Sequence, residues 1–254
     1  MSDTAATEAG TPQRGGDGGR MPAIYLSHGA PKACDHAITG RICAGATART
    51  EWIATPARLL DQAGALGPRS TVVHATHLTG DDIGLLGGSR TVACLCPTTE
   101  ADLADGVGPA RALAAAGCPL SLGSDSHAVI DLLQEARLVE MGERLTTGQR
   151  GSFRAAELAQ AATVAGHACL GWPEAGEIAA GAFADLVTLA LDTPRMAGTM
   201  AGTALESAIF AGSAADVRHV VISGADVVAD GKHLLVDDVP AALTAAITPL
   251  LTGA

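Results

Sequence analysis

The heptapeptide SLGSDSH, residues 121–127, changes character halfway along its length. Leu120 and Leu122 are typical of a buried strand, but the run then becomes polar and places a carboxylate, Asp125, where burial normally disfavours a charge. In parallel α/β folds the catalytic groups gather at the carboxyl ends of the strands. The stretch therefore predicts a strand that ends in a functional site.

The sequence around this strand alternates between short apolar runs and helical patterns. Strands are expected over 71–75, 91–96 and 119–123, and helices over 55–63, 79–87, 109–116 and 129–141. Short strands that are apolar throughout are covered on both faces, which is typical of parallel βαβ units. We therefore expect an α/β fold.

The rest of the chain divides into three further parts. Residues 1–20 lack periodicity and are predicted to be a disordered tail, and residues 21–52 form an atypical N-terminal segment with one apolar run at 23–26. The α/β region spans 53–172 and closes with a helix over 152–169. Residues 173–254 contain alternating patterns typical of strands over 185–191 and 217–229, with a tight turn at 224–226.

Composition limits the possible partners. The net charge is −11 and the basic residues are spread thinly, which argues against nucleic acid as a partner. No apolar run is long enough to cross a bilayer, and the N-terminus has no apolar core like that of a signal peptide. The six cysteines include no C-x-x-C pair and are expected to be free thiols. We expect a cytoplasmic protein that acts on a small molecule, without a membrane partner.

Polar side chains follow all three predicted strands. His74 and His77 follow the first, Glu100 the second, and Asp125 and His127 the third. Each could be a hydrogen-bonded structural residue, but three polar strand ends in succession favour a site. A neutral histidine and a carboxylate can orient and deprotonate water, especially water acidified by a metal ion. The pattern predicts a hydrolytic site and leaves open whether a metal takes part.

Three stretches carry a resemblance to a known family: VVHATHLTGDDIGLLGG (72–88), CLCPTTEADLADGVGPARAL (94–113) and LGSDSHAVIDLLQEAR (122–137). They resemble the later barrel strands of the amidohydrolase superfamily, in particular the formimidoylglutamate deiminases of histidine degradation. Residues 155–194 and 216–233 resemble the closing helix and the return to the small β-sandwich of those enzymes. The resemblance covers roughly 53–254 and implies an incomplete (β/α)8 TIM barrel, made of its later strands and helices, plus part of a C-terminal β-sandwich.

The resemblance also implies roles for individual residues. His74 would contact the substrate and shuttle protons, and Asp125 would bind one zinc ion and act as the general base for the attacking water. Thr99, Glu100 and His127 would flank the substrate. The implied reaction is hydrolysis of a C–N bond in N-formimidoyl-L-glutamate or a related amidine, with release of ammonia.

The chain also departs from the family pattern. The His-x-His metal pair of the first strand and the histidine ligand of the fifth are not found upstream of residue 53, which predicts a truncated or rearranged deiminase. Instead MPAIYLSHGAP (21–31) resembles the opening strand of class III extradiol dioxygenases, in which His28 would bind metal. His28 or His36 could replace missing ligands. A non-catalytic remnant or assembly partner, and a ring-cleaving dioxygenase, stay open as alternatives. Exposed strand edges predict a homo-oligomer.

Overall fold

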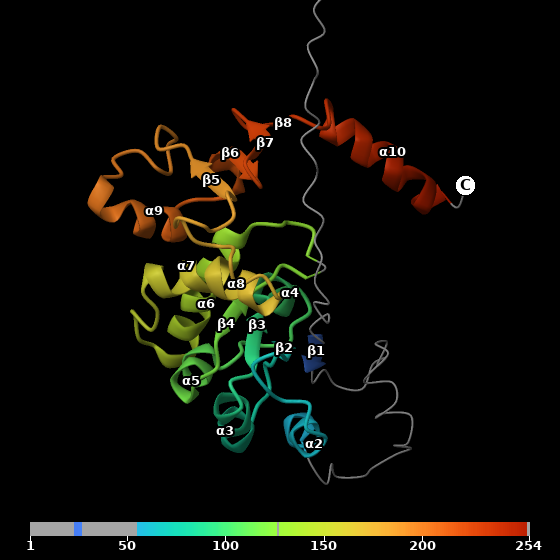
Figure 1. Ribbon diagram of the computed structural model, residues 1–254, viewed down its shortest axis with the longest axis vertical. Coiled ribbons are helices and arrows are strands. Elements are labelled where there is room, and N and C mark those ends of the chain that lie inside the picture. The colour runs from blue at the N-terminus through green and yellow to red at the C-terminus, as the bar shows by residue number, and fades with distance from the viewer. Residues whose placement is uncertain (1–22, 27–54, 126, 253–254) are drawn as a thin grey trace, which may run out of the picture.

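The computed structural model describes residues 23–26, 55–125 and 127–252 (Figure 1). The strands are β1 (Ala23–Leu26), β2 (Thr71–His74), β3 (Val92–Leu95), β4 (Leu120–Leu122), β5 (Leu186–Leu189), β6 (Val217–Ile222), β7 (Ala225–Ala229) and β8 (Lys232–His233). The α-helices are α2 (Pro56–Gln62), α3 (Gly80–Gly88), α4 (Pro97–Asp102), α5 (Ala110–Ala116), α6 (Leu132–Thr147), α7 (Ala155–Ala162), α8 (Val164–Cys169), α9 (Ala204–Phe210) and α10 (Val239–Thr252). The predictions for the 1–20 tail, His28 and His36 lie outside the described residues.

The first four strands form one parallel sheet in the order β1-β2-β3-β4. Thr71 of β2 pairs with Ala23 on one side and with Val92 on the other, so three strands lie side by side in register at that point. Helices α3 and α5 connect consecutive strands, as βαβ units require (Figure 1). The prediction of a parallel α/β sheet is confirmed.

Local capping explains where several helices begin and end. The Thr55 hydroxyl accepts a hydrogen bond from the Arg58 amide, and Pro56 occupies the first turn of α2. Thr79 and Asp82 form a reciprocal capping box at the start of α3. Gly117 ends α5 in a left-handed conformation, with φ 104°. These boundaries follow the sequence-based prediction closely.

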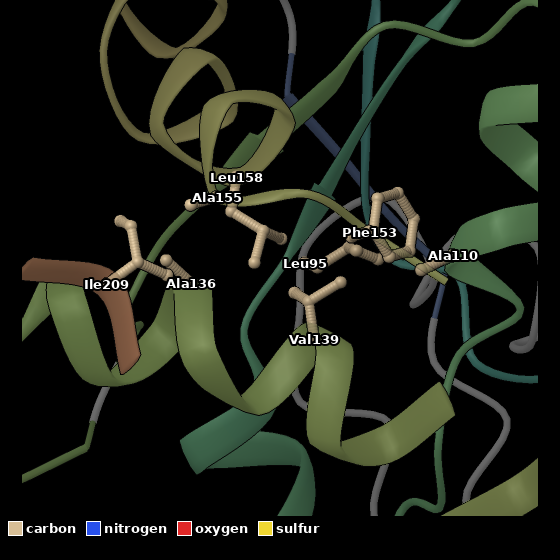
Figure 2. Packing of buried hydrophobic residues seen from close by; sticks show 8 residues of the cluster. All are labelled: Leu95, Ala110, Ala136, Val139, Phe153, Ala155, Leu158 and Ile209. Atoms are coloured by element: carbon tan, nitrogen blue, oxygen red, sulfur yellow. The ribbon is translucent and has the colours of Figure 1, made fainter. Parts of the chain in front are cut away.

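The core lies between the sheet and its helices. Ala93 and Leu95 alternate with Cys94 along β3, and both belong to buried clusters that the helices cover. Leu95 packs with residues of α5, α6, α7 and α9 and of the loop before α7, namely Ala110, Ala136, Val139, Phe153, Ala155, Leu158 and Ile209 (Figure 2). The packing fixes the sheet against α6 and so fixes the strand ends.

The helices differ from the prediction in three places. Helix α6 starts after Asp131, whose carboxylate accepts the amides of Leu133 and Gln134, so the apolar residues at 129–130 precede it. The expected helix over 152–169 is two helices, α7 and α8, because the chain breaks at Thr163 (φ −123°, ψ −92°). Gly176 packs so closely there that a Cβ would lie 2.7 Å from the Thr163 carbonyl carbon. Helix α4 was not predicted.

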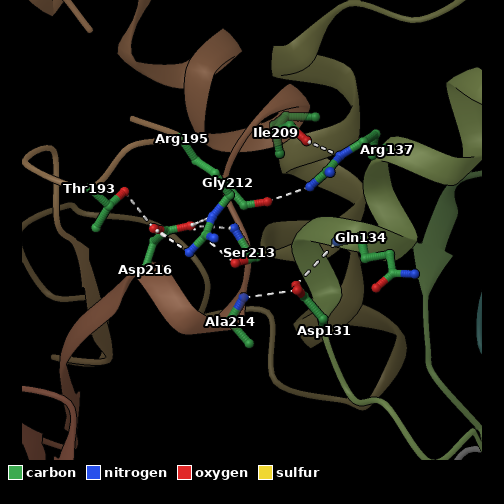
Figure 3. Close-up of polar contacts among 10 residues, drawn as sticks. All are labelled: Asp131, Gln134, Arg137, Thr193, Arg195, Ile209, Gly212, Ser213, Ala214 and Asp216. Carbon is green, nitrogen blue, oxygen red and sulfur yellow. Dashed lines mark hydrogen bonds and ion pairs between the residues drawn. The ribbon is translucent and has the colours of Figure 1, made fainter. Parts of the chain in front are cut away.

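The C-terminal strands form an antiparallel sheet in the order β5-β6-β7-β8. Ser223 and Gly224, both with positive φ, turn the chain between β6 and β7 near the predicted turn. The end of α9 and the segment after it are bound to α6 and its N-cap. Arg137 donates to the carbonyls of Ile209 and Gly212, and Asp131 accepts the Ala214 amide (Figure 3). None of the helices described is both long and apolar enough to cross a bilayer.

Asp216, the residue just before β6, carries a buried carboxylate that stabilises this C-terminal region. Its fully buried carboxylate accepts hydrogen bonds from Arg195, Thr193 and Ser213, and the Arg195 guanidinium is the largest cause of a pKa held well below the usual range (Figure 3). Asp216→Asn is expected to lower the free energy of unfolding by about 2–3 kcal/mol at neutral pH. The depressed pKa means that wild type loses this stability as pH falls, so urea unfolding should show the difference shrinking in acid.

The matched control is Asp192→Asn, which removes an exposed carboxylate that pairs with Arg218. An exposed pair of this kind contributes about 0–1 kcal/mol, so the control should unfold nearly as wild type does. Equal effects of the two substitutions would contradict the assigned role of Asp216.

Candidate active site

At two of the strand ends predicted from the sequence, the backbone has positive φ angles. His74 ends β2 with φ 68°, and Ala75 follows it with φ 50°. Asp125, three residues after β4, has φ 49°. Left-handed conformations are uncommon for residues other than glycine, and they gather at functional sites, where a side chain must be turned in a particular direction. Here the turns direct His74 and Asp125 toward each other.

His74 lies between two carboxylates. Its Nδ1 is 3.4 Å from Oε1 of Glu100, and its Nε2 is 3.4 Å from Oδ2 of Asp125. The side chains of His74 and Glu100 are buried, whereas that of Asp125 is 26% exposed. The arrangement is therefore open to solvent at Asp125 and closed at Glu100, with the imidazole between.

Two further hydrogen bonds hold the carboxylates in place. The backbone amide of Cys96 donates to Oε1 of Glu100 over 2.8 Å, and the hydroxyl of Thr99 donates to the carbonyl of Ser124 over 2.8 Å. The second bond joins α4 to the loop that carries Asp125. The relative position of Glu100 and Asp125 is thus fixed by short contacts within the site.

The electrostatics favour a protonated imidazole. Burial alone would lower the pKa of His74, but the hydrogen bond to Glu100 and the negative charges of Glu100, Asp125 and Asp105 outweigh it, so the pKa is raised above its usual value. A histidine of this kind can donate a proton near neutral pH.

The structure brings together only part of the predicted set. His74, Glu100 and Asp125 meet, and Thr99 is buried with its hydroxyl bound to Ser124. The ring of His127 faces its own loop, where Nδ1 accepts the Val129 amide, and the structure records no contact between it and the other three. Roles of Thr99, Glu100 and His127 toward a substrate stay predictions.

One expectation about Asp125 is wrong. The sequence suggested a buried carboxylate, but the side chain is about one-quarter exposed. The reason is that β4 ends at Leu122, so Asp125 lies in the loop beyond the covered part of the strand. The sequence also gave no sign of Asp105, whose charge acts on His74 from the loop after α4.

The described residues do not complete a metal site. Across residues 55–125 and 127–252, no group of three or more His, Cys, Asp or Glu side chains could hold a metal ion. Zinc in proteins commonly takes about three to four protein ligands. Asp125, a carboxylate that points toward His74 and is partly open, is the kind of group that could supply one of them.

Comparison with known proteins agrees with this geometry. The model of the amidohydrolase family matches residues 33–227. The chain belongs to the amidohydrolase family. The match includes the three strand ends of the site, and it confirms the family resemblance that the motifs at 72–88, 94–113 and 122–137 predicted.

Individual relatives of this amidohydrolase are deaminating enzymes. The chain is 36% identical to formimidoylglutamate deiminase of Pseudomonas aeruginosa over 66% of this chain and 39% of that protein. It is 30% identical to 5-methylthioadenosine/S-adenosylhomocysteine deaminase of Natronomonas pharaonis over 72% and 42%. A crystal structure of an adenosine deaminase from Xanthomonas campestris with bound zinc superposes with a TM-score of 0.70 at 28% identity, covering 77% of this chain and 45% of that one. The chain spans about two-fifths of the length of these relatives.

Proposed function

We propose that this amidohydrolase hydrolyses a C–N bond of an amidine, N-formimidoyl-L-glutamate or a close analogue, and releases ammonia. The observation that carries the proposal is the placement of His74 between Glu100 and Asp125 at the strand ends. The similarity to formimidoylglutamate deiminase supports the choice of substrate. Adenosine-type substrates are the nearest alternatives, since relatives that act on them also match.

The chain's own side chains suit the proton transfers of this reaction. The oxygen of water bonds to the amidine carbon, the bond from that carbon to its terminal nitrogen breaks, and both protons of water end on that nitrogen, which leaves as ammonia. Asp125, which is open to solvent, would accept the first proton from water. His74, whose pKa is raised by its carboxylate neighbours, would donate to the departing nitrogen.

We further propose that a divalent metal, zinc by analogy with the adenosine deaminase structure, is the cofactor and that Asp125 supplies one ligand. Such an ion, when bound, would acidify the attacking water. Metal analysis of protein expressed with added zinc tests this. Stoichiometric zinc in wild type and its loss in Asp125→Asn are expected, and zinc content unchanged by the substitution would contradict the assignment.

The substrate is tested directly by ammonia release. Zinc-supplemented protein should release ammonia and form N-formyl-L-glutamate from N-formimidoyl-L-glutamate, at a higher kcat/KM than for 5′-methylthioadenosine or adenosine. If either nucleoside is the better substrate, the proposed substrate would be a purine nucleoside and not an amidine. No release from any of the three would favour the alternative of a non-catalytic remnant or assembly partner, which the incomplete ligand set of the described residues also favours.

The parallel sheet is proposed to be the later part of a (β/α)8 barrel, and β5–β8 part of a small β-sandwich. In support, the structural match covers 77% of this chain but 45% of its neighbour. Among the described strands β4 pairs only with β3, and an open strand edge favours pairing with another chain. We therefore propose a homo-oligomer, and a stable monomer in size-exclusion chromatography with light scattering would contradict it.

A further inference from the structure

Helix α6 carries buried carboxylates that bind other parts of the fold. Glu135 is fully buried, and its carboxylate accepts the Thr98 amide over 3.0 Å as well as the Thr98 hydroxyl. Two turns further along, buried Glu143 accepts the Arg111 amide over 2.7 Å. Each carboxylate therefore binds the first turn of a different helix, α4 or α5.

These two helices need such a partner. The first amides of a helix have no acceptor within the helix and are usually capped by a nearby side chain. Cys96 and Pro109, which precede α4 and α5, provide no side-chain cap. A carboxylate on α6 takes that place in each case, and its negative charge also suits the positive end of the helix. Glu135 and Glu143 therefore have the same structural role, because each one caps the first turn of a neighbouring helix.

Glu135 and Glu143 differ in which residues lie in the helix turn that each one binds. The first turn of α4 places Thr98, Thr99 and Glu100 in succession. Thr98 binds Glu135, Thr99 binds the carbonyl of Ser124, and Glu100 contacts His74 and the Cys96 amide. A shift of this turn would move Glu100 away from His74. The first turn of α5 contains no such group.

We propose that Glu135 is a positioning residue for the active site: by binding the first turn of α4 from α6, it holds Glu100 against His74 and the Cys96 amide. Glu135 does not touch the imidazole and acts only through α4. The inference rests on the proposed function for the catalytic meaning of Glu100, but the placement of Glu100 can be measured without substrate.

The test compares Glu135→Leu with Glu143→Leu in the full chain, by amide hydrogen exchange read by NMR. In Glu135→Leu the Thr98 and Cys96 amides should exchange about tenfold faster or more, with the Arg111 amide unchanged. In Glu143→Leu only the Arg111 amide should change. The 15N resonances of the His74 ring, recorded at one fixed pH, should move in the first variant and stay in place in the second.

The outcome that overturns the proposal is faster exchange at Thr98 with the Cys96 amide and the His74 resonances unchanged, because Glu135 would then be a cap without influence on the site. If Glu135→Leu does not fold, Glu135→Gln, which keeps an acceptor oxygen, and the isosteric Thr98→Val should show the same pattern at smaller amplitude, and its absence in both overturns the proposal. If wild type releases no ammonia, the proposed function is contradicted, but the exchange and NMR measurements still test the positioning role of Glu135.

Discussion

Asp125→Asn is expected to lower the rate of ammonia release from N-formimidoyl-L-glutamate by about 10²–10⁴-fold, the range typical of losing a general base. The amide has nearly the same size as the carboxylate and can occupy the same position at φ 49°, so the fold should be retained. It cannot accept a proton from water, it removes the negative charge 3.4 Å from Nε2 of His74, and it removes the proposed zinc ligand. Steady-state kinetics with coupled ammonia detection provides the measurement.

The matched control for this substitution is Asp105→Asn. Asp105 also acts on His74 through its charge, but it stands in the loop after α4 and makes no recorded contact with the imidazole. Its loss should reduce the rate far less than the loss of Asp125. Similar rates for the two variants, with unchanged circular dichroism, would mean that the carboxylate contributes only charge and would remove the general base from the proposed reaction.

Much of this site could be predicted from the sequence because it depends on local signals. Apolar runs and the helices between them predicted the parallel strands, and parallel strands bring their carboxyl ends to one edge. Strands β2 and β4 lie on either side of β3, so the strand ends that carry His74 and Asp125 lie near each other on that edge. Thr79 and Gly117 marked helix ends for reasons that lie within a few residues of each.

The features that were predicted wrongly or missed depend on contacts between segments distant in sequence. Helix α4 is short and starts at a residue that cannot cap it, and its first turn is held by Glu135, 37 residues away from Thr98. The break at Thr163 reflects the close approach of Gly176. The exposure of Asp125 follows from where β4 stops pairing. No periodicity in the sequence records any of these three facts.

Glu100→Gln is expected to have the second large effect, through the protonation of His74. The carboxylate contributes both the hydrogen bond at Nδ1 and a negative charge, and together these raise the pKa of His74 against the effect of burial. Glutamine removes the charge, so the pKa of His74 should fall and less of the imidazole should be protonated at neutral pH. If His74 donates to the departing nitrogen, the rate should fall by about 10²-fold or more.

The sign of the pH dependence makes this prediction specific. A histidine whose pKa is higher in the folded state contributes stability that is fully present below its unfolded value, near about 6.5, and is lost as pH rises through the folded value. Wild-type unfolding free energy should therefore decline as pH rises above about 6.5, and Glu100→Gln should flatten that decline. A 15N NMR titration of His74 measures the pKa itself. Glu143→Gln makes the same chemical change at another buried carboxylate and should leave the titration of His74 unaltered, whereas equal shifts in both variants would mean that the imidazole responds to net charge and not to Glu100.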